Sequence, residues 1–92
     1  MTVKELLKDY QWEWKEVIIY SGDYYSTGDI EEQEEQNRLY TVFSTKGKER
    51  PYYLFDKHVE PFNDYTIWAW WVDENGLEIM LNERLDYIRK GK

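Results

Sequence analysis

The residues of this chain that could do chemistry are mostly carboxylates. The 92-residue sequence has 19 Asp and Glu residues, one histidine and no cysteine. His58 stands between Asp56 and Glu60, an arrangement that suits a general base oriented by a carboxylate, although a lone histidine among charged residues is typical of an exposed surface. The sequence combines no nucleophile, base and stabilising group in one pattern and has no metal-loop spacing. It therefore predicts neither an enzyme nor a metal or cofactor site.

The net charge of −7 belongs to one segment of the chain. Between Lys15 and Arg38 there are seven carboxylates and no basic residue, whereas the rest of the chain has 12 acidic and 12 basic residues. The densest part places five carboxylates in seven positions: Asp29, Glu31, Glu32, Glu34 and Glu35. A charge excess of this kind repels nucleic acid and anionic membranes and attracts basic protein surfaces.

Three interpretations of the acidic segment are open at the level of sequence. A cation site of the EF-hand type needs alternating oxygen ligands, which residues 23–35 lack. A solvated loop that keeps the protein soluble is the usual role of a charge run. The third interpretation is a recognition surface for a basic protein partner, because concentrating the whole net charge in one window exceeds what solubility requires.

Two helices are predicted near the ends of the chain. Thr2 and Glu5 form a capping box that predicts a short helix over residues 3–9. Leu85 and Ile88 stand at helical spacing within residues 82–90, which end in basic residues, so a closing helix is expected there. The acidic stretch 26–37 is predicted to be an exposed loop or a short surface helix without an apolar face.

Five runs rich in β-branched and aromatic residues predict strands. They cover residues 17–20, 38–45, 51–55, 65–72 and 77–81. Turn residues at 46–49 and 75–76 join the second run to the third and the fourth run to the fifth as hairpins. The prediction is one α+β domain over residues 1–92: an antiparallel sheet of about four or five strands, flanked by a short N-terminal helix and a C-terminal helix.

The predicted turn at Asn75 and Gly76 decides which side chains of the last hairpin share a face. It opposes Val72 to Ile79 and defines one face as core. That predicted core face has six apolar residues: Trp68, Trp70, Val72, Leu77, Ile79 and Leu81. The opposite face carries Trp71 and Met80 among charged neighbours, which makes it a mixed surface.

Three stretches of the chain resemble the small acidic proteins carried by phages and prophages. They are residues 1–7 (MTVKELL), 17–20 (VIIY) and 64–76 (DYTIWAWWVDENG). Small acidic phage proteins of this size include anti-CRISPR and other anti-defence inhibitors, several of which present carboxylates where their target expects nucleic-acid phosphate. The resemblance thus implies an inhibitor context and supplies no catalytic residue.

The sequence and this resemblance together predict a non-enzymatic protein-binding inhibitor that occupies a basic nucleic-acid-binding groove by phosphate mimicry. The expected partner is a protein with a basic surface, such as a CRISPR effector nuclease or another defence protein, with no direct binding to nucleic acid. The predicted partner-binding residues are Asp23, Tyr24, Tyr25, Asp29, Glu31, Glu32, Glu34, Glu35 and Trp71. The alternative is a phage or bacterial adaptor module that binds through the apolar sheet face at Trp71 and Met80.

The expected location is the cytoplasm of the host cell. The longest uncharged apolar run covers residues 66–72, which is far shorter than the ~20 residues that a membrane-spanning helix needs. The first residues of the chain show no basic segment followed by an apolar one, so no export signal is predicted. Membrane binding is accordingly not expected.

Overall fold

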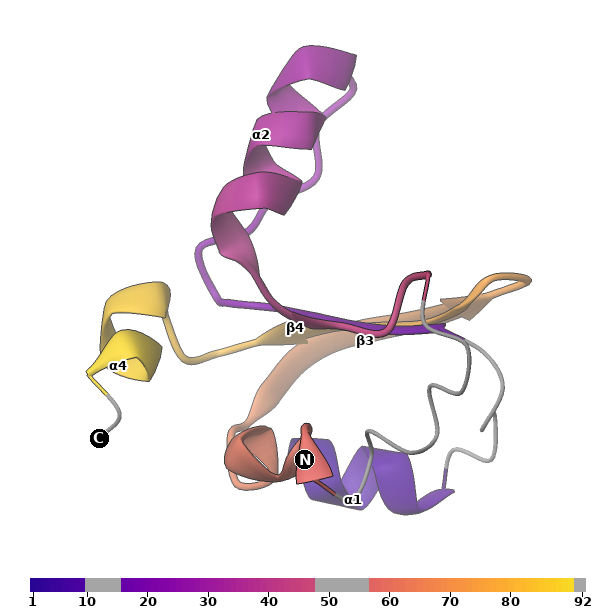
Figure 1. Ribbon diagram of the computed structural model, residues 1–92, viewed down its shortest axis with the longest axis vertical. Helices are drawn as coiled ribbons and strands as arrows, with labels where there is room; N and C mark the ends of the chain where they lie inside the picture. The colour runs from indigo at the N-terminus through magenta and orange to yellow at the C-terminus, as the bar shows by residue number, and fades with distance from the viewer. Residues whose placement is uncertain (10–15, 48–56, 91–92) are drawn as a thin grey trace.

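A four-stranded sheet with helices on both faces forms the centre of the molecule (Figure 1). The computed structural model describes residues 1–9, 16–47 and 57–90. The strands are β1 (Glu16–Tyr20), β2 (Thr41–Ser44), β3 (Ile67–Asp73) and β4 (Gly76–Leu81). The helices are α1 (Val3–Asp9), α2 (Ile30–Tyr40), α4 (Leu85–Arg89) and the 3-10 turn η1 (Glu60–Phe62). The α+β class, with short helices near both ends, is as predicted.

The sheet is mixed, and the prediction of a purely antiparallel sheet was wrong. The strand order is β2-β1-β4-β3, in which β1 and β4 pair in parallel and both outer pairs are antiparallel. The two parallel strands are central and carry the most deeply buried side chains, as parallel strands generally do. Their pairing joins residues about 60 positions apart, which local sequence patterns do not reveal.

The main core lies on the face of the sheet covered by α1 and η1. Val17 and Ile19 of β1 and Ile79 of β4 are fully buried there against Val3 and Leu6 of α1. The predicted capping box holds α1 in place, because the Glu5 N–H donates to the Thr2 hydroxyl at 3.2 Å and the Thr2 N–H donates to the Glu5 carboxylate at 2.8 Å.

The tryptophans of β3 do not belong to this core, which corrects the prediction. The turn residues are Glu74 and Asn75, so Val72 lies opposite Leu77 rather than Ile79. A two-residue shift keeps residues 69–73 on their predicted faces, but a register irregularity between Ile67 and Ala69 turns Ile67 toward the main core. However, Trp68 and Trp70 are 59% and 45% exposed, because β3 is the last strand of the sheet and α1 covers mainly the central strands.

The segment between β1 and β2 contains more helix than predicted. α2 continues to Tyr40, so residues 38–40 are helical rather than extended, and the predicted strand 38–45 is reduced to Thr41–Ser44. The predicted partner strand 51–55 lies outside the described residues. At the other end, α4 starts at Leu85 with Arg84 as its N-cap, and is therefore shorter than the predicted helix over 82–90.

Candidate functional site

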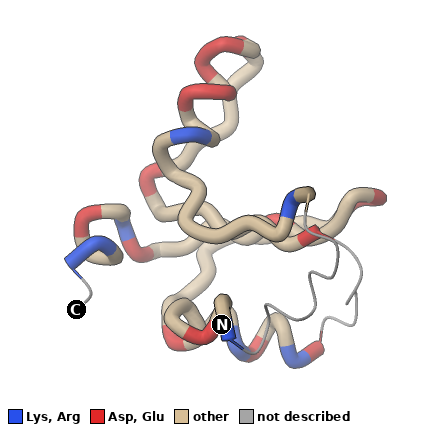
Figure 2. Tube along the Cα trace, in the orientation of Figure 1, with Lys and Arg blue, Asp and Glu red and all other residues tan. Residues whose placement is uncertain are grey.

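α2 stands away from the sheet instead of lying on it (Figure 1). Asp29 begins the helix, since its carboxylate accepts the Glu32 N–H at 2.9 Å. Acidic positions follow one another along the helix (Figure 2). The helix therefore presents most of its surface, and most of the acidic segment, to solvent.

The inner side of α2 is held by two glutamines that face the preceding loop. The Gln33 amide donates to the Tyr24 hydroxyl at 2.8 Å and accepts the Thr27 N–H at 2.8 Å. The buried Gln36 accepts the Tyr25 N–H at 3.3 Å. These bonds explain how a helix without an apolar face is fixed to the fold, a role that sequence reasoning did not assign to either glutamine.

Three of the four glutamates of α2 project from the opposite side of the helix. With about 100° per residue, Glu31, Glu34 and Glu35 fall within an arc of about 100° that is centred directly opposite Gln33 and Gln36. Glu32 lies about 60° beyond this arc, on the side toward Gln36, where its carboxylate meets the preceding loop. We call these four side chains the acidic ridge: Glu31, Glu32, Glu34 and Glu35. All four are exposed, so the ridge is a solvent-facing surface.

Two members of the acidic ridge have partners within the described structure. The Glu32 carboxylate accepts hydrogen bonds from the Tyr25 hydroxyl and the Thr27 hydroxyl, each at 3.0 Å. The hydrogen bond to this carboxylate raises the pKa of the Tyr25 hydroxyl. Glu35 pairs with Arg38 at 2.6 Å, but both side chains are more than half exposed, and ion pairs of that kind contribute little to stability.

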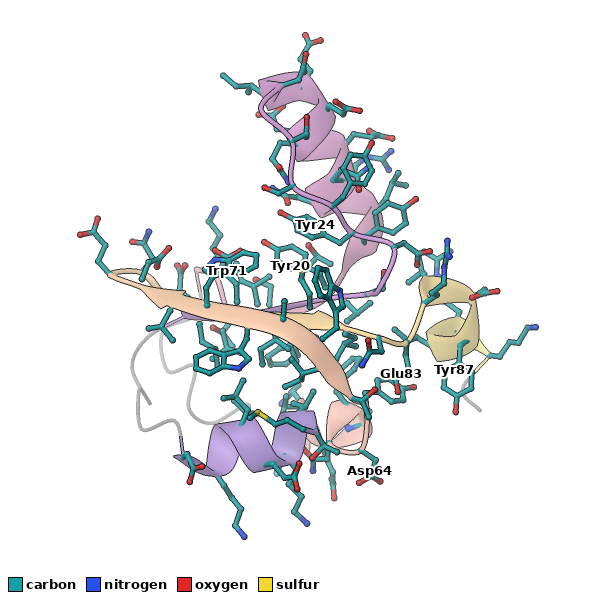
Figure 3. All side chains as sticks on the ribbon, turned by 180° about the vertical axis from the view of Figure 1, so that it is seen from behind. Tyr20, Tyr24, Asp64, Trp71, Glu83 and Tyr87 are labelled. Atoms are coloured by element: carbon teal, nitrogen blue, oxygen red, sulfur yellow. The ribbon has the colours of Figure 1, made fainter. Side chains whose placement is uncertain are left out.

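The aromatic residues predicted to bind a partner lie at different depths. Tyr25 is 49% exposed beside Glu32 and so adjoins the acidic ridge. Tyr24 is buried and stacks on Tyr20, with ring centroids 3.8 Å apart, which gives it a structural role (Figure 3). Trp71 is half-buried against the same cluster, on the sheet face below α2 and apart from the ridge.

A groove of about 590 Å³ separates the inner side of α2 from the sheet. Trp71 and Tyr20 line it together with the carboxylates of Glu16 and Glu78. The Tyr20 hydroxyl donates to Glu78 at 3.0 Å, and its burial, with the neighbouring Glu78 charge, raises the pKa of Tyr20. Because Met80 is buried, the face proposed for the adaptor alternative offers little free apolar area.

Asp23 is separated from the other predicted site residues and serves the fold. Its carboxylate accepts hydrogen bonds from the Leu85 N–H at 2.7 Å, Arg84 at 2.8 Å and the Ser21 hydroxyl at 3.1 Å. It thereby caps the start of α4, whose own N-cap residue makes no side-chain cap. Burial opposes ionisation of Asp23, but these hydrogen bonds outweigh it, so the pKa of the carboxyl lies below its usual value.

Asp23→Asn is expected to lower the free energy of unfolding at pH 7 by about 1–3 kcal/mol, because the neutral amide cannot replace three bonds to a carboxylate. The lowered pKa stabilises the fold above the unfolded pKa of about 3.9, and this stabilisation disappears as the pH falls through the folded value. Urea denaturation from pH 7 to pH 3 should show the two proteins converging. Asp64→Asn, at an exposed position, is the control, and a gap that stays constant with pH would contradict this account.

Within residues 1–9, 16–47 and 57–90, no group of three or more His, Asp or Glu side chains is arranged to hold a metal ion. None of the helices in these ranges is long and apolar enough to cross a membrane. The most prominent functional candidate in the described part of the chain is therefore the acidic ridge, flanked by Tyr25 and capped by Asp29.

Comparison with known proteins finds no relative of this chain. No protein-family model, curated protein or solved structure matches the chain. What the protein does is therefore inferred from the geometry and charge of its own residues.

Proposed function

We propose that the protein is a non-enzymatic inhibitor that binds a basic, nucleic-acid-binding groove of a partner protein through the acidic ridge. The observation that carries this proposal is the placement of α2: the glutamates of the acidic ridge are exposed, and the helix that carries them stands clear of the sheet (Figures 1 and 2). An acidic segment that only kept the protein soluble would not need a helix to hold its carboxylates in place.

The spacing of the carboxylates matches the charge density of a nucleic acid. From Glu31 to Glu35 the helix rises about 6 Å and carries four carboxylates. Duplex DNA carries one phosphate charge per ~1.7 Å of its axis, or between three and four over the same length. A cationic groove shaped for nucleic acid would therefore meet a similar density of negative charge on α2.

Contacts within the protein prepare the acidic ridge for such binding. Tyr25 and Thr27 hold the Glu32 carboxylate in one position before a partner arrives, which lowers the entropy cost of association. The exposed Arg38 that pairs with Glu35 can be replaced by a partner cation at little cost. Tyr25 adds aromatic contact area beside the charges.

The partner class that we propose is a nuclease of a CRISPR or other defence system, in the cytoplasm of a phage-infected host. This choice rests on the resemblance to small acidic phage proteins and on the basic nucleic-acid grooves that such nucleases have. Binding would exclude nucleic acid from the groove without any chemical step by this chain.

Changing the whole acidic ridge to glutamine is expected to weaken partner binding by at least 100-fold, because four charges directed at a basic groove are lost while side-chain shape is kept. The test captures partners from a bacterial lysate on the immobilised parent and on the variant, and then measures the affinity of each captured protein. Raising the salt from about 50 to 500 mM shortens the Debye length from ~14 to ~4 Å and should slow association with the parent.

A control variant removes the same number of charges outside α2, so that net charge and local charge are separated. It changes four exposed carboxylates to amides: Asp9, Glu60, Asp64 and Asp86. We expect this control to retain most of the affinity, and duplex DNA to compete with the parent for the partner. The proposal fails if the glutamine variant captures the same proteins equally well, or if the partner holds DNA and this protein at once.

A further inference from the structure

Three apolar side chains of β3 are exposed to solvent. Trp70 and Val72 share one face of the strand and are 45% and 37% exposed, and Trp68, at the register irregularity before them, is 59% exposed. Neighbouring exposed aromatic side chains mark interaction surfaces, where Trp is enriched. We propose that the outer edge of β3 is a dimer interface, at which β3 of a second copy of this chain adds antiparallel to the sheet.

The backbone of β3 has hydrogen-bonding groups free for such pairing. In a parallel pair of residues, only one residue bonds to the neighbouring strand. In the Glu16–Gly76 pair this residue is Glu16, whose N–H donates to the Asn75 carbonyl at 3.2 Å. The N–H and C=O groups of Gly76 therefore point the other way, toward β3. Because antiparallel pairs alternate between bonded and non-bonded positions, Trp70 and Val72 direct their N–H and C=O groups away from β4. In the described part of the chain, no strand pairs with β3 on that outer side.

The N-terminus limits the pairing to the second half of the strand. The Ile67 N–H donates to the Met1 carbonyl at 2.8 Å, so the beginning of the edge is already occupied. A two-fold axis at Trp71 pairs the remaining residues of the strand, 69–73, with the same residues of the second copy. It places Trp70 of each copy opposite Val72 of the other, so the exposed apolar row continues across the interface.

The edge lacks the features that usually keep a strand from pairing with another molecule. Monomeric proteins protect edge strands with Lys, Pro or bulges. Ile67–Asp73 contains neither Lys nor Pro, and its register irregularity lies between Ile67 and Ala69, at the end that Met1 occupies. Its one charged residue, Asp73, would face Ala69 of the second copy and not another carboxylate.

The distribution of charge also allows two copies to approach at this edge. The chain carries a net charge of −7, which opposes association in general. However, α2 leads into β2, at the opposite edge of the sheet from β3. Figure 3 views the sheet from the β3 side, with α2 rising above it. The acidic ridges of two copies would therefore lie at the far sides of the dimer.

The area available predicts a weak dimer. The exposed parts of the three side chains amount to about 300 Å² per copy, or ~600 Å² for two. Strand backbone adds to this but leaves the interface below the ~1,200–2,000 Å² of stable complexes, among weak and transient contacts. We expect a dissociation constant of about 10–100 µM.

Sedimentation equilibrium of the full chain from about 2 to 500 µM tests the proposal by mass action. The apparent mass should rise from 11.4 kDa toward twice that value. Val72→Lys, which places charges in the interface, should weaken the dimer at least tenfold. Val72→Pro removes an N–H that β4 does not use and should have the same effect, with circular dichroism confirming the fold of each variant.

Ile30→Lys is the matched control, because it makes the same charge change at a 77% exposed apolar residue of α2. It should leave the dimer intact. A parent that stays monomeric at about 500 µM overturns the proposal, as does a dimer that persists in both folded Val72 variants. The acidic ridge is unchanged in all three variants, so these results are independent of the proposed inhibitor function.

Discussion

Replacing Gly76 with alanine is expected to lower the free energy of unfolding by about 3–5 kcal/mol, as the sum of backbone strain and steric overlap. Gly76 has a φ of +148°, which side-chain-bearing residues rarely adopt. A Cβ atom at this position would overlap the carbonyl group of Glu16, at the first pair of the parallel β1–β4 ladder. Alanine must therefore push apart the two central strands of the sheet.

Urea denaturation of Gly76→Ala and of a matched glycine variant measures this effect. Gly28→Ala is the control, because a Cβ there has no neighbour within 4 Å and the backbone needs no positive φ. We expect Gly28→Ala to change stability by less than about 0.5 kcal/mol. Equal losses in the two variants would mean that the close approach of β1 and β4 at Gly76 is not as described.

Tyr24→Ala is expected to cost about 3–5 kcal/mol and to release α2 from the sheet. The ring is 7% exposed and lies parallel to Tyr20, while its hydroxyl accepts the Gln33 amide at 2.8 Å. The main core does not include Tyr24, so the packing of β1 and β4 against α1 should survive. Hydrogen exchange should show lost protection in α2 with retained protection in β4.

Tyr24→Phe is the companion variant, since it keeps the stacked ring and removes one hydrogen bond, at a cost of about 1 kcal/mol. If the inhibitor proposal is right, Tyr24→Ala weakens partner binding although every carboxylate of the acidic ridge is still present, and Tyr24→Phe binds nearly as the parent does. Equal protection of α2 in Tyr24→Ala and the parent would show that the remaining glutamine bonds, from the Thr27 and Tyr25 N–H groups, hold the helix without Tyr24.

Features that depend on near neighbours in the sequence were predicted well. Thr2 and Glu5 are three residues apart, and the capping box they form defines α1 without help from distant residues. The last hairpin was also predicted. Its turn is one residue earlier than Asn75-Gly76, because Gly76 pairs with Glu16 in the β1–β4 ladder and belongs to the strand. Local propensity therefore located the strands but not their register.

Features that depend on distant residues were missed. No local pattern states that β1 pairs with β4, so the parallel ladder was not predicted. Gln33 and Gln36 look like ordinary polar residues until the loop at Tyr24 folds back to meet them. Asp23 was grouped with the acidic segment by charge, whereas its three donors come from Ser21 and from a helix some 60 residues further along the chain.

The parallel pairing of β1 with β4 also sets the order in which the chain can fold. β1 is synthesised about 60 residues before β4, so it cannot pair with β4 until α2, β2 and β3 have been made. Closing a loop of that length carries an entropy cost that is recovered only when the final ladder forms, which is typical of slow folding. A chain interrupted before Gly76 would lack the strand that joins β1 to β3 and could not form this sheet.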